Sequence, residues 1–225
     1  MTVNVLFYGD PHGEWRPLFR ACEIEAPDAV VLMGDMDLDE PLSDKVRPLT
    51  DAGVAVHWIA GNHDGDRTEW HDRLFHGGLE GGNLNARVAD LGGVRVAGLG
   101  GVFRSKIWHP LDGDGTVRFA TRAEYLAIQK PQARWRGGMP LKQRVSIFYE
   151  DFDALAGKRA DVLVTHEAPS CHPYGMGEFD DLARSLGASL IVHGHHHRPY
   201  EDRLPCGIEV LGTGLATAHR RRFGD

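Results

Sequence analysis

Five short segments of the sequence carry side chains that bind metal ions well. Each places Asp, Asn or His beside Gly or another polar residue, and together they extend over most of the chain: Gly9-Asp10-Pro11-His12-Gly13, Gly34-Asp35, Gly61-Asn62-His63-Asp64, Thr165-His166-Glu167 and Gly194-His195-His196-His197. Carboxylate, carboxamide and imidazole donors without cysteine suit manganese, iron and magnesium, and also zinc. A lone Gly-Asp is more often only a turn. The ordered set is what predicts a metal site.

The number of donors indicates two ions. The candidate ligands are Asp10, His12, Asp35, Asn62, His166, His195 and His197. They are too many for one ion but fit two ions that share a bridging carboxylate. A two-metal centre holds a hydroxide as nucleophile and clamps phosphoryl oxygens during in-line displacement. The set therefore predicts hydrolysis of a phosphoester.

Short apolar runs precede the five segments and are typical of buried β-strands. They occupy residues 3–8, 29–33, 54–59, 160–165 and 189–192, and helix-compatible stretches cover 14–25 and the residues up to Asp51. This alternation favours right-handed βαβ units, in which functional groups collect beyond the carboxyl ends of parallel strands. We therefore expect one metal site at one sheet edge. Residues 85–100 favour a hairpin around Gly92-Gly93 and hence an antiparallel second sheet.

The composition is that of an ordinary globular protein. The 225 residues are 42% hydrophobic and 25% charged, which is enough for one well-buried core, so we expect a single domain over residues 1–225. The net charge of −7 argues against a broad nucleic-acid surface, although it leaves a small phosphorylated ligand open.

We expect neither a targeting signal nor paired cysteines in this chain. Met1 leads directly into an apolar strand, and no apolar run reaches membrane-spanning length. The three cysteines are widely spaced, which predicts neither a disulfide framework nor a zinc ribbon. We expect a cytoplasmic protein without membrane contact.

A basic insertion interrupts the pattern at about residues 101–157. Its first fifty residues hold nine Lys/Arg against four Asp/Glu in an otherwise acidic chain. Two interpretations stay open: a solvated helical excursion, or a lid that offers cations to a phosphorylated substrate.

The insertion also contains four aromatic residues that could form either a dimer contact or a small core of the insertion itself: Trp108, Trp135, Phe148 and Tyr149.

The motif series closely resembles that of the calcineurin-like metallophosphoesterase superfamily, over residues 3 to about 214. The resemblance implies an α/β fold of two packed mixed β-sheets flanked by helices, a four-layer αββα sandwich. It also implies two divalent ions, manganese first, with iron, magnesium, zinc and nickel as alternatives. One ion would be held by Asp10, His12 and His197, the other by Asn62, His166 and His195, with Asp35 bridging them.

The same resemblance assigns the chemistry to the third segment. His63 would stand beside the ions as general acid or as electrostatic partner of the leaving oxygen, and Asp64 would orient it. The expected substrate is a small phosphoester, a monoester or a diester. A non-catalytic binding scaffold on the same fold and a nuclease acting on nucleic-acid ends are the alternative functions, and the nuclease would need a continuous basic track.

The chain departs from the superfamily where two arginines are expected. Protein serine/threonine phosphatases and the related diadenosine tetraphosphate hydrolases usually carry Asp-Arg-Gly soon after the bridging aspartate, and an arginine before G-N-H. Here Met36 follows Asp35 and Ala60 precedes Gly61. This favours the smaller phosphodiesterase or phosphatase branches. Arg67, Arg104 or an arginine of the basic insertion are the candidates to replace the lost phosphate contacts.

The remaining polar residues receive less specific expectations. We expect His193 to be packed rather than ligating, and Asp37, Asp39 and Glu40 to belong to a solvated acidic loop near the metal edge. His196 and Glu167 are open between a role beside the site and exposure to solvent. The tail His219 to Arg222 is expected to be a solvated terminus.

Overall fold

Two β-sheets form the centre of the computed structural model, which describes residues 2–224. The first sheet has the strand order β10-β1-β2-β3. Its strands β1 (Val3–Gly9), β2 (Ala29–Leu32) and β3 (Ala55–Trp58) are parallel, and β10 (Thr217–Phe223) pairs antiparallel with β1. Right-handed crossovers through α1 (Arg16–Glu25) and through α2 (Leu42–Lys45) with α3 (Arg47–Asp51) account for the parallel order.

The second sheet has the order β4-β5-β6-β7-β9-β8. Strands β5 (Arg95–Leu99), β6 (Val162–Thr165), β7 (Leu190–His193) and β9 (Glu209–Gly212) are parallel. The edge strands β4 (Arg87–Asp90) and β8 (Tyr200–Arg203) pair antiparallel with β5 and β9. The expected hairpin is therefore present, but the expectation of an antiparallel second sheet was wrong. The sheet is mixed, because β6, β7 and β9 follow crossovers.

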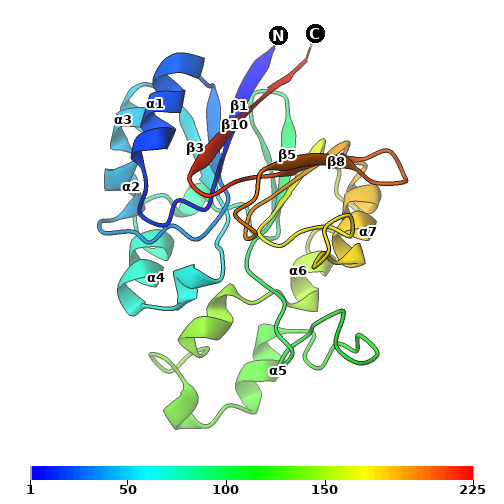
Figure 1. Cartoon of the computed structure of the whole chain (residues 1–225). Coiled ribbons are helices and arrows are strands. Elements are labelled where there is room, and N and C mark those ends of the chain that lie inside the picture. The colour runs from blue at the N-terminus through cyan, green and yellow to red at the C-terminus, as the bar shows by residue number, and fades with distance from the viewer. Residues whose placement is uncertain (1, 225) are drawn as a thin grey trace.

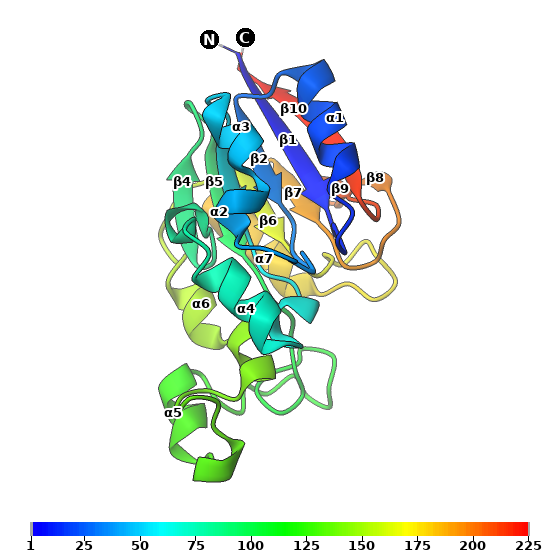
Figure 2. The same ribbon diagram turned by 90° about the vertical axis from the view of Figure 1, so that its left-hand side faces the viewer.

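Alternating side chains of the strands fill three apolar layers. In β1, Val5 and Phe7 point between the two sheets, while Leu6 and Tyr8 pack under α1 to α3. In β6, Leu163 packs on the far side, against α7 (Gly177–Leu186). The helices thus cover both outer faces of the pair of sheets. In Figure 2 the layer with α1, α2 and α3 is turned towards the viewer. This confirms the expected four-layer sandwich of two mixed sheets flanked by helices.

The basic insertion lies beyond the carboxyl ends of the strands, at the end of the molecule opposite the termini (Figure 1). It contains α5 (Arg122–Ala127), two short 3-10 turns (Pro131–Ala133 and Leu141–Val145) and α6 (Tyr149–Asp153). Phe103, Trp108 and Phe148 are buried in the layer that also holds α7. The insertion is therefore continuous with the outer core of the second sheet, although Tyr149 remains 42% exposed.

The insertion also packs on α4 (Thr68–Phe75). Arg136 donates to both carboxylate oxygens of Asp72, at 2.9 and 2.8 Å, and Arg144 Nε donates to His71 Nε2 at 2.8 Å. The Trp135 indole N–H donates to the Thr68 hydroxyl. These contacts join the insertion to the first half of the chain.

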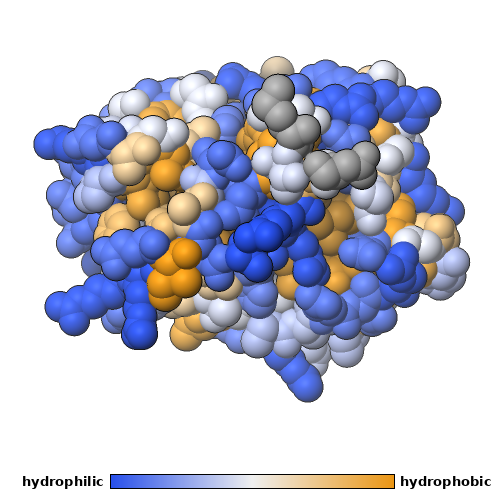
Figure 3. Space-filling model, turned by 90° about the horizontal axis from the view of Figure 1, so that it is seen from above, coloured by the Kyte–Doolittle hydropathy of each residue, from blue (hydrophilic) through white to orange (hydrophobic). Residues whose placement is uncertain are grey.

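The expectation of a solvated C-terminal tail was wrong. Residues 219–222 lie inside β10, where their backbone pairs with β1 from Val3↔Phe223 to Gly9↔Thr217. Strand pairing satisfies this backbone although its side chains are polar. Figure 3 looks onto the face of the molecule that carries both termini, where hydrophobic patches alternate with a larger hydrophilic surface. Within residues 2–224, the helices are too short and too polar to cross a lipid bilayer.

Candidate metal centre

The five ligand segments meet where the carboxyl ends of both sheets face each other. Asp10, Asp35 and Asn62 follow β1, β2 and β3 of the first sheet, whereas His166 and His195 follow β6 and β7 of the second. The expectation of a single sheet edge is therefore corrected. The site spans two sheets, because each contributes part of the donor set.

One group of donors consists of Asp10, His12 and His197, whose ligand atoms lie within 4.8 Å of one another. The Nε2 atoms of His12 and His197 are 3.2 Å apart. Asp10 is fully buried, and both its carboxylate oxygens accept from the backbone N–H of His195, at 3.0 and 3.1 Å. The first β-strand is thereby connected to the segment that carries His197.

A second group consists of Asp35, His166 and His195. His166 Nε2 is 3.3 Å from Asp35 Oδ2 and 3.1 Å from Asn62 Oδ1. Asp35 also reaches the first group, since its Oδ2 lies 3.8 Å from His12 Nε2. The two groups therefore share Asp35 at their boundary.

The donor chemistry fits divalent cations. His166 Nδ1 lies 2.8 Å from the carbonyl oxygen of Met33, so the proton of a neutral ring belongs on Nδ1. This leaves the lone pair of Nε2 facing the oxygens of Asp35 and Asn62, all of them acceptors. The Nε2 atoms of His12 and His197 also face each other, and Asp37 at Nδ1 of His12 leaves the lone pair of a neutral His12 ring on Nε2. A cation between such acceptors relieves their mutual repulsion.

The local electrostatics favour positive charge at this point. Burial opposes protonation of His166, but the carboxylates of Asp35 and Asp10 raise its pKa to about 10. Burial likewise opposes ionisation of Asp35, yet His166 and the backbone N–H of His63 lower its pKa. By contrast, burial and the neighbouring His166 lower the pKa of His195 to about 3, which keeps that ring neutral and able to ligate.

The backbone of the site is strained. Asp10, His12, Asp35, His195 and His197 all have positive φ angles, between 36° and 71°. Residues other than glycine adopt this left-handed backbone region at a cost of roughly 1–2 kcal/mol each. Five candidate ligands share the feature, which is typical of functional sites. Glycine motifs in the sequence indicate sharp turns here, but they do not reveal that the ligands themselves are left-handed.

Glycine is required where the ligand loops touch. An added Cβ at Gly34, where φ is +99°, would lie 2.5 Å from Gly61 N and 2.7 Å from His166 Nδ1. At Gly61 an added Cβ would overlap Asp35 Oδ1. The loops after β2 and β3 can therefore approach each other only without side chains at these two positions.

His63 lies beside both groups of donors. Its backbone N–H donates to Asp35 Oδ1 at 2.7 Å, and its ring centroid is 5.3 Å from that of His12. Its Nδ1 is 2.8 Å from Asp66 Oδ2, which leaves Nε2 available to a ligand. His63 and Asp66 are three residues apart across a 3-10 turn (His63–Gly65), a spacing that aligns their side chains.

Asp64 has a different environment from the one expected. Its carboxylate is 1% exposed and accepts the backbone N–H groups of Asp35, Gly61 and Met36, at 2.9, 2.7 and 2.9 Å. It thus fastens the loop after β2 to the loop after β3. The carboxylate in contact with His63 is that of Asp66, and a one-turn spacing in the sequence was the signal that could have identified it.

The acidic loop after Asp35 divides into two parts. Asp37 Oδ2 lies 3.2 Å from His12 Nδ1 and so orients that ring, a contact that the expectation of a solvated loop missed. Asp39 and Glu40 instead pair with Lys45, at 2.7 and 2.8 Å.

The residues left open by the sequence find partners near the site. His193 is buried, with Nε2 2.7 Å from the Tyr200 hydroxyl, as expected for a packed histidine. His196 stacks on His172 with ring centroids 3.8 Å apart. Glu167 is buried and accepts the backbone N–H of Phe103 at 2.7 Å. Burial raises the pKa of Glu167 to about 7.

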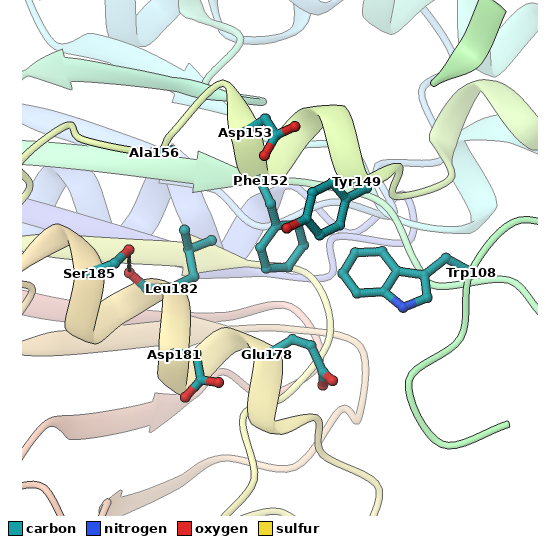
Figure 4. A pocket seen from close by; sticks show the side chains of 9 residues that line it. All are labelled: Trp108, Tyr149, Phe152, Asp153, Ala156, Glu178, Asp181, Leu182 and Ser185. Carbon is teal, nitrogen blue, oxygen red and sulfur yellow. Dashed lines mark hydrogen bonds between the residues drawn. The ribbon is translucent and has the colours of Figure 1, made fainter. Parts of the chain in front are cut away.

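A pocket of about 320 Å³ lies elsewhere, between α6, α7 and Trp108 (Figure 4). Its wall is aromatic, from Trp108, Tyr149 and Phe152, and its rim carries Asp153 and Glu178 together with Asp181. None of the metal-ligand candidates lines it, and its acidic rim would repel a phosphoester.

Comparison with known proteins places the chain in context. A family model for the calcineurin-like phosphoesterases matches residues 3–199. A protein of Haemophilus influenzae described as uncharacterized is 36% identical over 211 residues, which span 94% of this chain and 91% of the relative.

Two solved structures share the fold at low sequence identity. TT1561 of Thermus thermophilus is 16% identical, with a TM-score of 0.60 over 96% of this chain and 91% of that one. The 5'-nucleotidase of Candida albicans is 15% identical, with a TM-score of 0.51 over 95% of this chain and 46% of that one.

The family match encloses the whole site, from Asp10 to His197, and the structure independently gathers those ligand candidates at one place. The chain belongs to the calcineurin-like phosphoesterase family.

Proposed function

We propose that this chain is a dinuclear-metal-dependent phosphoesterase that acts on a small phosphoester. The observation that carries the proposal is the pair of three-residue donor groups that meet at Asp35, with His63 beside them. Family membership supports the reaction class. Residues Asp10, His12 and His197 would hold one ion, Asn62, His166 and His195 the other, and Asp35 both.

Manganese is the ion we propose first, because the donors are carboxylate, carboxamide and imidazole without thiolate. When bound at such a site, two divalent ions would supply activated water and would stabilise negative charge on the phosphoryl oxygens. The protein's part is to fix the donors: Asp37 orients His12, and Met33 orients His166.

His63 is the proposed proton donor to the leaving oxygen. Asp66 accepts the proton of His63 Nδ1 and so fixes the ring, which leaves Nε2 turned away from that contact and able to carry the proton that is transferred. The side chain is 46% exposed, which allows proton exchange with solvent between turnovers. Asp64, fully buried and bound to three backbone N–H groups, is proposed to hold the loops rather than to move a proton.

The experiment compares three proteins loaded with Mn²⁺: the wild type, His63→Ala, and a control variant at an exposed histidine, His76→Ala. The assay uses p-nitrophenyl phosphate, bis-p-nitrophenyl phosphate and a panel of phosphoesters. We expect kcat to fall about 10²- to 10⁴-fold in His63→Ala with the metal content unchanged, as for loss of a general acid, and to stay the same in His76→Ala. A wild type that hydrolyses no member of the panel would refute the proposed function. A fully active His63→Ala would refute the role of His63.

A further inference from the structure

Arg104 is a cation near the metal centre whose Nε has no acceptor. It lies near the start of the basic insertion, next to Phe103, whose backbone N–H donates to Glu167 in the loop after His166. In residues 2–224, the Arg104 Nε is buried and finds no hydrogen-bond acceptor. Buried polar groups are almost always paired, because removing a guanidinium from water without an acceptor is costly. The Arg104 Nε–H is therefore a donor that an anionic ligand could satisfy.

The surroundings of Arg104 show on which side of the site it lies. Burial lowers the pKa of Arg104, and the carboxylates of Asp66 and Glu167 act against that shift. Asp66 is the partner of His63, and Glu167 follows the candidate ligand His166. Arg104 is thus held next to the loop that carries His166 through Phe103 and Glu167, and it is near enough to Asp66, the partner of His63, to feel its charge.

Lys142 of the insertion reaches the same place. Its Nζ is 3.1 Å from Asp66 Oδ1, while Asp66 Oδ2 contacts His63. The Lys142 side chain is 64% exposed, so its ammonium group keeps donors for a ligand.

Two other cations of the insertion are held in ion pairs away from His63. Arg122 binds Asp151 and Glu150, and Arg136 binds Asp72. Their charge is therefore used to hold the insertion together and to attach it to α4, whereas Arg104 and Lys142 stand beside the proposed proton donor.

We propose that Arg104 and Lys142 form a binding site for a second anionic group, carried by the leaving portion of the substrate. This rests on the proposed function, in which His63 protonates the leaving oxygen, so the space beyond His63 receives the departing group. The substrate class is then a phosphoester or phosphoanhydride whose leaving portion bears its own phosphate or carboxylate.

The test measures binding first, so that it does not depend on turnover. The Mn²⁺-loaded protein is titrated with 4-carboxybenzylphosphonate and with 4-carbamoylbenzylphosphonate, which differ in one charge and are not hydrolysed. We expect the wild type to prefer the carboxylate about tenfold or more, as for a charge-assisted hydrogen bond. The double variant Arg104→Gln with Lys142→Gln should bind both ligands equally. The preference is then measured in turnover, as the ratio of kcat/KM for the carboxylate-bearing substrate to kcat/KM for the carboxamide-bearing substrate. The substrates are the corresponding aryl phosphates and methyl aryl phosphodiesters.

Two controls separate this site from general effects of charge or folding. Lys130→Gln removes a cation of the insertion outside the proposed anion site and should leave the preference unchanged. Arg104→Lys should retain part of it. Circular dichroism and metal content check that each variant is folded and loaded. An equal preference in the wild type and in the double variant overturns the inference, even if both proteins hydrolyse phosphoesters. A lost preference without any turnover supports the anion site and refutes the proposed reaction instead.

Discussion

Replacing His71 by Gln should remove a pH-dependent part of the protein's stability. His71 lies on α4 with a fully buried side chain, and its Nε2 accepts from Arg144 of the basic insertion. Burial and the neighbouring Arg144 lower its pKa from 6.5 to about 4, against a smaller opposite effect of Asp72. The neutral ring is therefore the form that the fold accepts, since protonation would abolish the acceptor and bring two cations together.

The sign and size follow from proton linkage. A group with a lowered pKa in the folded state contributes stability above its unfolded pKa of 6.5, and this contribution is lost as the pH falls towards 4. At pH 5 the unfolded state is protonated and the folded state is mostly not. From the unfolded-state pKa of 6.5 down to pH 5 is about 1.5 pH units, and each unit corresponds to about 1.4 kcal/mol. His71 should therefore lower the free energy of unfolding by about 2 kcal/mol between pH 7 and pH 5.

Urea unfolding at pH 7 and at pH 5 measures this change in stability directly. EDTA is present in both buffers so that metal binding makes no contribution. The free energy of unfolding of wild type should fall by about 2 kcal/mol more than that of His71→Gln over this interval. His109→Gln is the control, because His109 belongs to the basic insertion and its ring lies beside Asp112 rather than beside His71. If wild type and His71→Gln lose equal stability between the two pH values, the reasoning is wrong.

Three further predictions concern the metal centre. Asp66→Asn should lower kcat about 10- to 100-fold with metal content unchanged, because His63 loses its carboxylate partner; steady-state kinetics measure this. Gly61→Ala should abolish Mn²⁺ binding, since the added methyl would overlap Asp35 Oδ1, and titration calorimetry measures the affinity. Asp64→Ala should destabilise the protein by about 3 kcal/mol or more, because three buried backbone N–H groups lose their acceptor; thermal unfolding reports it.

Each of these has an outcome that contradicts it. Full activity in Asp66→Asn would mean that His63 is oriented by other contacts. Normal Mn²⁺ affinity in Gly61→Ala would mean that the two ligand loops can separate at little cost. An unchanged melting temperature in Asp64→Ala would mean that water replaces the carboxylate.

The meeting of the candidate ligands at one place could be predicted because each follows a buried parallel strand. Such strands are continuous apolar runs, as in Ala29 to Leu32 and Val162 to Thr165, and their boundaries are visible without knowledge of the tertiary fold. The motifs then specify which side chains lie at the carboxyl ends. An apolar run does not show which of the two sheets its strand joins. The division of the donors between two sheets could therefore not be predicted from these runs.

Other elements depend on contacts between distant segments. Strand β10 carries several arginines and has little apolar character, and it is a strand because β1 offers it a free edge. The partner of His63 depends on the turn conformation of residues 63–65, which decides between Asp64 and Asp66. Neither choice follows from residue type alone.

The division of the site between two sheets makes its geometry depend on a layer of core that touches no ligand. Phe7, Met33, Val164 and Val192 lie in the apolar layer that separates the sheets, and their volumes set how far apart the two ligand-bearing edges stand. A change of one or two methylene groups there would alter the spacing between the two donor groups without touching a donor. Selection for metal spacing should therefore act on buried aliphatic side chains as well as on histidines and aspartates.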